Sequence, residues 1–233
     1  LLRAAVVAHH RQQSGGGANS SGVRFSNFDG NTFADMEVGI AVHPGTVAGI
    51  TGNQTFNSVT ENRIVEGNVN ETGTWAAQTV PYVADSIEVF GATMPVLTLS
   101  AGLQLRFENG EWLQVGVDGN GGLQIQGAAG NPVGMESRSA GAYGGEWYGL
   151  FFGNGTLPGT TVTQLELRHG GRAGFGTQGG VTFVDAGNNV TIQNSSFELN
   201  DQADVYVDCE SNPTLTANTY GSTPGLDFEV CPM

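Results

Sequence analysis

The amino-acid sequence predicts an all-β protein that folds as a β-solenoid, in which short strands stack coil upon coil. Three observations favour this class: alternating apolar runs of about five residues, turn-forming residues at their ends, and similar strands about every 17–24 residues. Glycine supplies 37 of the 233 residues, and charged residues only 13%. After Gln13 no segment shows the 3.6-residue apolar period of a long helix.

The N-terminal segment differs in composition from the rest of the chain. Residues 1–13, "LLRAAVVAHHRQQ", predict a short helical piece that caps the first coil, and residues 14–22 form a Gly/Ser-rich linker. The segment does not begin with Met and lacks the pattern of a signal peptide. We therefore expect it to be the cut end of a longer chain, with the solenoid spanning residues 23–233.

Eleven short runs of alternating apolar and polar residues follow. Each is bounded by Gly, Asn, Asp or Pro, which form turns. The predicted strands lie at 38–42, 62–67, 86–91, 103–107, 112–116, 123–127, 147–152, 163–168, 180–184, 189–194 and 204–208. One coil cannot bury its apolar face alone, so about eight to ten stacked coils must form the core together.

An internal repeat divides the predicted solenoid into two units. "FDGNTFADMEV" (28–38) and "FELNDQADVYV" (197–207) share the pattern F-x-x-N-x-x-A-D-[MV]-x-V at a separation of about 169 residues. The repeat predicts that residues 23–75 are the end of one unit and residues 76–233 the next unit.

Longer segments carry a resemblance to a known superfamily. These segments are "PVLTLSAGLQLRF" (95–107), "GGLQIQGAAGNPVGM" (121–135), "EWYGLFF" (146–152), "TVTQLELRHGG" (161–171) and "NVTIQNSSFELN" (189–200). They resemble the right-handed parallel β-helix (pectate-lyase-like) superfamily, and within it the repeat units of large bacterial extracellular and surface proteins. The resemblance implies a right-handed parallel β-helix. It implies little about function, because the fold hosts many functions.

The charge of the chain excludes several kinds of partner. The net charge is −14, and all eight basic residues are Arg. Such a chain repels phosphate backbones and anionic lipid surfaces, so we expect no nucleic-acid binding. No apolar run approaches the roughly 18 residues of a membrane span, so we expect no membrane insertion in this segment. Acidity suits an exposed surface, and we expect an extracellular or cell-surface location.

Two cysteines, Cys209 and Cys231, lie near the C-terminus. They are about one coil apart, so a structural disulfide between them would tie neighbouring coils. A disulfide would also indicate an oxidising, extracellular setting. The alternative is two unrelated buried thiols.

Asparagines at the predicted turns have a structural and a modification hypothesis. In a stacked solenoid an inward Asn can satisfy turn backbone groups and form a ladder with the next coil. The candidates for this role are Asn27, Asn31, Asn53, Asn194, Asn200 and Asn218. The alternative is glycosylation at the N-x-[ST] sequons of Asn19, Asn53, Asn70, Asn154, Asn189 and Asn194. Phe197 is expected in the core.

The sequence assigns no catalytic residue, but one basic cluster is a candidate. The resemblance implies that lyases of this fold use acidic residues to hold Ca²⁺ and a Lys or Arg as base. "LRHGGR" offers Arg168, His169 and Arg172, which could bind a carboxylate and abstract a proton. The alternative is an ordinary Gly-rich turn between coils.

Metal and sugar sites are less clearly indicated. No His/Cys spacing predicts zinc, and no metal site or other cofactor is expected beyond Ca²⁺ loosely bound by Asp118, Asp201 and Asp204. The aromatic residues that could stack on sugars are Trp112, Trp147 and Tyr148. Trp147 also fits an inward core position, with Gly149 giving room for its ring.

These observations predict a non-catalytic extracellular structural or adhesive module, such as an adhesin stalk, a fibre or a filament subunit of a larger secreted or surface protein. The expected partners are glycans or further copies stacked end to end. The alternatives are a polysaccharide lyase or hydrolase and a carbohydrate-binding module of the pectate-lyase-like fold.

Overall fold

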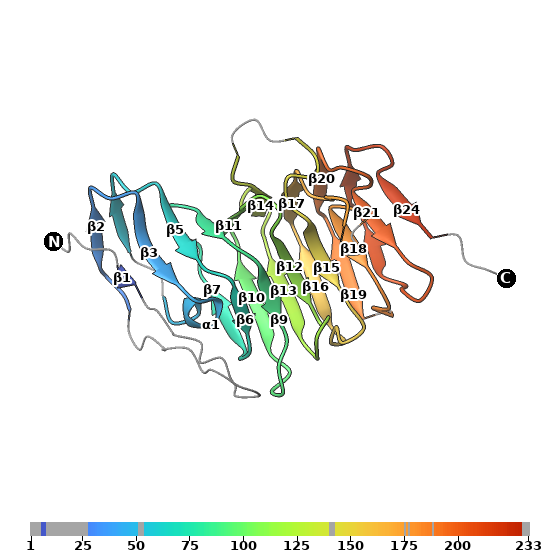
Figure 1. Cartoon of the computed structure of the whole chain (residues 1–233), viewed down its shortest axis with the longest axis horizontal. Coiled ribbons are helices and arrows are strands. Elements are labelled where there is room, and N and C mark those ends of the chain that lie inside the picture. The colour runs from blue at the N-terminus through green and yellow to red at the C-terminus, as the bar shows by residue number, and fades with distance from the viewer. Residues whose placement is uncertain are drawn as a thin grey trace.

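The chain winds into a parallel β-solenoid with its strands side by side along the long axis (Figure 1). The computed structural model describes residues 6–7, 28–50, 54–139, 143–174, 176, 178–187 and 189–229. Within these residues the regular structure is strand apart from one short helix, α1 (Pro44–Val47). The predicted all-β solenoid is confirmed, and each of the eleven predicted runs contains a strand.

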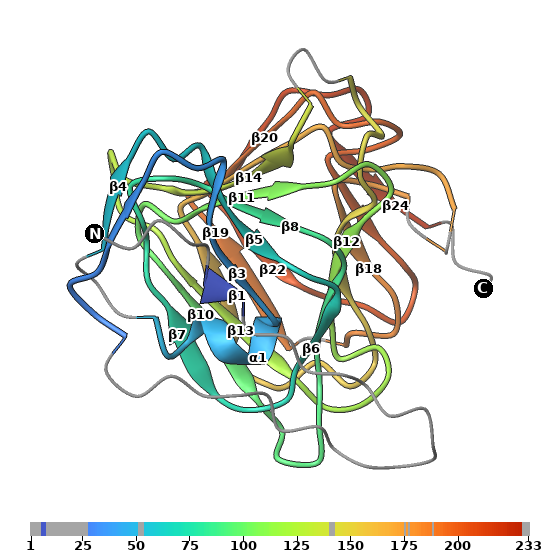
Figure 2. The same ribbon diagram turned by 60° about the vertical axis from the view of Figure 1, so that its left-hand side comes forward.

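Three long parallel sheets form the walls of the solenoid (Figure 2). Sheet 1 contains β1 (Val6–Val7), β3 (Val38–Val42), β5 (Glu61–Ile64), β8 (Tyr82–Ala84), β11 (Gln104–Phe107), β14 (Val133–Ser137), β17 (Leu165–Arg168), β20 (Ser196–Glu198) and β23 (Thr219–Tyr220). Sheet 2 contains β6 (Gly67–Val69), β9 (Ile87–Val89), β12 (Trp112–Val115), β15 (Gly149–Phe152), β18 (Val181–Phe183), β21 (Val205–Val207) and β24 (Leu226–Phe228). Sheet 3 contains β7 (Gly73–Trp75), β10 (Val96–Ser100), β13 (Gly122–Gln126), β16 (Thr160–Thr163), β19 (Val190–Gln193) and β22 (Thr214–Thr216). β2 (Thr32–Ala34) and β4 (Thr55–Asn57) form a separate pair.

Apolar side chains form ranks that run through the interior from coil to coil. In sheet 1 the register aligns Leu105, Met135, Leu167 and Phe197, and all four are fully buried. The Phe197 ring stacks on that of Tyr220 with centroids 5.8 Å apart, as expected for a core residue. Each coil therefore buries its apolar face against the next, which makes the core continuous.

Two expectations about helices are wrong. Val6–Val7 form strand β1, which pairs with β3, rather than part of a helix; two adjacent β-branched residues favour the strand. The rest of the N-terminal piece lies outside the described residues. The short helix α1 was not predicted: Pro44 occupies its first turn, and His43 Nδ1 accepts a hydrogen bond from the Gly45 N–H at 3.2 Å. A four-residue helix is too short to show an apolar period.

The coils in the middle of the solenoid are longer than predicted. In sheet 1 Val42 aligns with Ile64, 22 residues later, but Phe107 aligns with Ser137, 30 residues later. Much of the additional length lies in two long turns that connect sheet 1 to sheet 2, at 138–148 and 169–180. The predicted spacing of 17–24 residues is therefore wrong for these coils, because turn length has no periodicity that a sequence pattern reveals.

The two copies of the sequence repeat do not occupy equivalent positions. Val38 lies in β3 of sheet 1, whereas its counterpart Val207 lies in β21 of sheet 2. Asp35 is exposed, whereas its counterpart Asp204 is fully buried. The sheets also continue across the predicted join after residue 75, since β7 pairs with β10. The motif therefore recurs in sequence without recurring as one structural unit.

Candidate functional site

All five arginines in the described part of the chain lie on sheet 1 or on a turn that follows it. They are Arg63, Arg106, Arg138, Arg168 and Arg172. Basic side chains in the described residues are thus confined to one wall and its corner. This region contains the predicted basic cluster and is the candidate functional site.

On the outer face of sheet 1, ion pairs join arginines to acids on neighbouring coils. The Arg106 Nε lies 2.9 Å from Glu136 Oε1, and Arg168 NH2 lies 3.5 Å from Glu198 Oε2. The strand register places each pair side by side. Such exposed pairs each contribute about 0–1 kcal/mol. Arg168, a candidate catalytic residue, is thus paired across the coils.

A second network surrounds Glu108 at the end of β11. Its carboxylate binds both Arg63 and Arg138, and Arg138 NH2 also lies 3.0 Å from Glu61 Oε2. Burial raises the pKa of Glu108, but hydrogen bonds and charge from the two arginines outweigh it and lower the pKa overall. Glu108 therefore stays ionised and links three coils.

The "LRHGGR" segment forms a turn that is closely packed between coils. The Gly170 N–H donates to Asn200 Oδ1 at 2.8 Å, and the Arg172 N–H donates to the Trp147 carbonyl at 3.2 Å. Gly171 has φ +84°, and a Cβ there would lie 2.2 Å from the Asp201 carbonyl oxygen. These contacts agree with the alternative that the segment is a Gly-rich turn between coils.

His169 lies in this turn with φ +63°. Its Nδ1 is buried and has no hydrogen-bond partner among the described residues. Desolvation lowers the pKa of the imidazole, and the charge of Arg168 lowers it further, against the opposing effects of Glu136 and Glu146. The imidazole is therefore neutral near pH 7, but no described group orients it as a general base.

Five side chains from three coils meet beside this turn, and we call them the turn cluster: Asn109, Trp112, Glu146, Tyr148 and Arg172. Asn109 Nδ2 donates to Glu146 Oε2 at 2.8 Å, and Arg172 NH1 donates to Asn109 Oδ1 at 2.6 Å. The Arg172 guanidinium lies 5.6 Å from the centroid of the Tyr148 ring. The Trp112 and Tyr148 rings are 5.8 Å apart and tilted by 59°.

The turn cluster combines groups that suit a polar organic ligand. It offers half-buried aromatic rings, a guanidinium, an amide and a carboxylate. The sequence identified Trp112, Tyr148 and Arg172 as candidates but missed Asn109 and Glu146. No local motif marks these two, because 37 residues separate them and only the coil register brings them together.

Trp147 is not part of a sugar-binding surface, and the prediction that it lies in the core is confirmed. Its ring is fully buried and stacks on Phe107 with centroids 4.3 Å apart and planes 2° apart. Its Nε1 donates to the Arg168 carbonyl at 2.8 Å. The predicted role of Gly149 is different, however: a Cβ there would lie 2.3 Å from the Gly180 carbonyl oxygen. The glycine permits close approach of the next coil.

Two of the predicted asparagines satisfy backbone groups across coils. Asn218 Oδ1 accepts from the Ser195 N–H at 3.0 Å, and its Nδ2 donates to the Ile192 carbonyl at 3.0 Å. Asn200 Oδ1 accepts from Gly170 in the same way. Asn62, which the sequence analysis missed, accepts from the Ile40 N–H at 3.2 Å.

The remaining asparagine predictions have different outcomes. Asn31 Nδ2 donates to Gln54 Oε1 at 3.1 Å, so its partner in the next coil is glutamine rather than a stacked asparagine. Asn194 is exposed with φ +53° and does not point inward; the left-handed turn that it adopts suits asparagine. Asn27 and Asn53 lie outside the described residues.

The acidic residues proposed for Ca²⁺ do not form a common site. Asp118 lies on the β12–β13 turn, whereas Asp201 and Asp204 lie on the β20–β21 turn. The buried Asp204 carboxylate accepts from Ser222 N–H at 2.8 Å and from Asn200 Nδ2 at 2.7 Å, which is a structural role. Of the predicted disulfide, Cys231 lies outside the described residues, and the pairing stays a prediction.

The geometry defines a parallel β-solenoid protein with a polar turn cluster at one corner. No family model, curated protein or solved structure matches the chain. In the part that the structure describes, no helix has the length and apolar character needed to cross a membrane.

Proposed function

We propose that the chain is a non-catalytic extracellular structural or adhesive module, a stalk, fibre or filament subunit of a larger secreted or surface protein, in the right-handed parallel β-helix superfamily. The observation that carries the proposal is the use of polar side chains along the solenoid axis. Arg63, Arg106, Arg138 and Arg168 all pair with acids on other coils. A surface whose charges hold coils together favours stiffness over turnover.

The C-terminal end of the described solenoid supports assembly through its ends. β22, β23 and β24 are the last strands of their sheets, so each has an edge without a paired strand in the described part of the chain. On β24, Leu226 is 37% exposed and Phe228 58% exposed. Unpaired edges with exposed apolar side chains favour pairing with another chain.

Sedimentation velocity over a range of protein concentrations tests this assembly. We expect larger species as concentration rises, and we expect Phe228→Lys to abolish them. Met94→Lys is the matched control, because Met94 is 53% exposed and lies on the β9–β10 turn. A monomer at every concentration would contradict the filament form, and equal effects of both variants would contradict assembly through β24.

The turn cluster favours glycan binding as a second candidate function. Tyr148 offers a ring for stacking, while Asn109, Glu146 and Arg172 offer polar groups beside it. A glycan array tests it: signal lost in Arg172→Ala but kept in Arg106→Ala supports a ligand at the cluster. Arg106 is the control because it pairs with Glu136 on the face of sheet 1.

The enzymatic alternative has its own test. Incubation with uronate polymers, followed by ultraviolet absorbance of the unsaturated product, detects lyase activity directly. Turnover that disappears in Arg168→Ala would overturn the non-catalytic proposal.

A further inference from the structure

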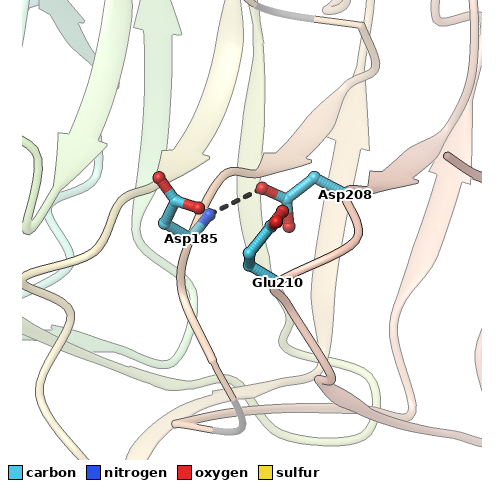
Figure 3. A group of neighbouring side chains, drawn as sticks. All are labelled: Asp185, Asp208 and Glu210. Carbon is cyan, nitrogen blue, oxygen red and sulfur yellow. Dashed lines mark hydrogen bonds between the residues drawn. The ribbon is translucent and has the colours of Figure 1, made fainter. Parts of the chain in front are cut away.

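Three carboxylates meet at the end of sheet 2, on the side of the molecule that the turn cluster does not use. Asp185 follows β18, and Asp208 and Glu210 follow β21 on the next coil. One carboxylate oxygen from each lies within 4.8 Å of the others. Figure 3 shows the three side chains converging from two adjacent turns.

Asp208 is the buried member of this group, and one of its oxygens lacks a partner. The residue is only 8% exposed. Its Oδ2 accepts from the Asp185 N–H at 2.7 Å, whereas its Oδ1 is buried and has no hydrogen-bond partner among the described residues. A buried carboxylate oxygen is costly unless a donor or a cation satisfies it.

No basic side chain in the described part of the chain compensates these three charges. The five described arginines lie on sheet 1 and its turns, and the ion pairs found there involve other acids. Three converging carboxylates without a described counter-charge repel one another. A bound cation would remove this repulsion and satisfy Asp208 Oδ1.

We propose that Asp185, Asp208 and Glu210 bind one Ca²⁺ ion, with water completing the coordination. The ligands are all oxygen, which suits hard cations. Two of the three carboxylates are exposed and lie on turns, so their geometry is adaptable. Ca²⁺ accepts six to eight oxygens in irregular arrangements, whereas Mg²⁺ demands a near-ideal octahedron and dehydrates reluctantly.

The ion would act as a clamp between two coils near the C-terminal end. The same two turns are already joined by hydrogen bonds from the Ala186 N–H to Ser211 Oγ at 2.9 Å and from the Asn212 N–H to the Gly187 carbonyl at 2.5 Å. Three monodentate carboxylates on partly exposed turns correspond to weak sites, with Kd about 10⁻⁴–10⁻³ M, the range of extracellular calcium modules.

The test is a CaCl₂ titration of the whole 233-residue chain after treatment with a chelator, followed by calorimetry and by the thermal unfolding midpoint. We expect one site and a midpoint that rises with Ca²⁺. Asp208→Asn and Glu210→Gln should each weaken binding about tenfold or more. Glu210 is exposed, so its variant reports on binding even where Asp208→Asn folds poorly.

Asp118→Asn is the matched control, because it removes an exposed carboxylate from a turn that follows sheet 2 on another coil. It should leave Ca²⁺ affinity unchanged, and MgCl₂ should raise the midpoint of the unmodified chain less than CaCl₂. Three results would each overturn the site: no midpoint shift at about 10 mM Ca²⁺, ten times the weakest expected Kd; full affinity in Glu210→Gln; or an equal loss in Asp118→Asn.

Discussion

Arg172 donates from NH1 to Asn109 Oδ1 at 2.6 Å, although the two residues are 63 positions apart in the chain. Asn109 follows β11 and Arg172 follows β17, so the bond crosses the coil of β14 that lies between them. Asn109 also donates to Glu146 on that middle coil. The amide therefore links three successive turns at the corner between sheets 1 and 2.

This link predicts a measurable coupling between the two side chains. Arg172→Ala and Asn109→Ala should each lower the free energy of unfolding, and the double variant should lose about 0.5–1 kcal/mol less than the sum of the two. Urea unfolding of the four proteins gives the coupling. Additive losses would show that the bond contributes nothing, whatever other contacts Arg172 makes.

The stack of Trp147 on Phe107 predicts a large packing effect. Trp147→Ala should lower the free energy of unfolding by about 3–5 kcal/mol, because it leaves a cavity between adjacent coils and removes the donor to the Arg168 carbonyl. Trp112→Ala is the control, since Trp112 is only half-buried. Chemical denaturation measures both, and a loss no greater than that of the control would contradict the core assignment.

The strand positions were predictable because their pattern is local. β13 and β17 alternate buried and outward residues, as the sequence pattern indicated. β8 and β14 were not among the predicted runs: β8 is buried at every position and β14 at all but one, which leaves little or no alternation. The turn cluster and the acidic site depend on which turns become neighbours. That is set by coil length, which local patterns do not encode.

Gly171 predicts a test of how closely the coils pack at the "LRHGGR" turn. Gly171→Ala should destabilise the protein far more than Gly159→Ala, although both glycines have φ near +80°. At Gly159 a Cβ has nothing within 4 Å, so only the backbone penalty of about 1–2 kcal/mol applies. At Gly171 the Cβ would lie 2.2 Å from the Asp201 carbonyl oxygen. Similar midpoints of thermal unfolding for the two variants would show that the turn can move apart.

His169 predicts how stability depends on pH. Burial lowers the pKa of its imidazole below the ordinary 6.5, so the unfolded chain binds a proton more readily than the folded chain. The free energy of unfolding should therefore rise with pH up to about 6.5, and this contribution is lost as pH falls toward the lower pKa of the folded state.

Glu108 acts in the same direction at lower pH. Its pKa in the folded state is lowered overall, so its contribution is complete above the ordinary 4.5 and is lost on further acidification. Thermal midpoints between about pH 5.5 and 7.5, above the range in which Glu108 titrates, isolate the histidine. His169→Asn keeps a residue type that tolerates positive φ and removes the imidazole, so the slope in this window should flatten. An unchanged slope in His169→Asn would assign the pH dependence to other groups and contradict the buried, neutral state of His169.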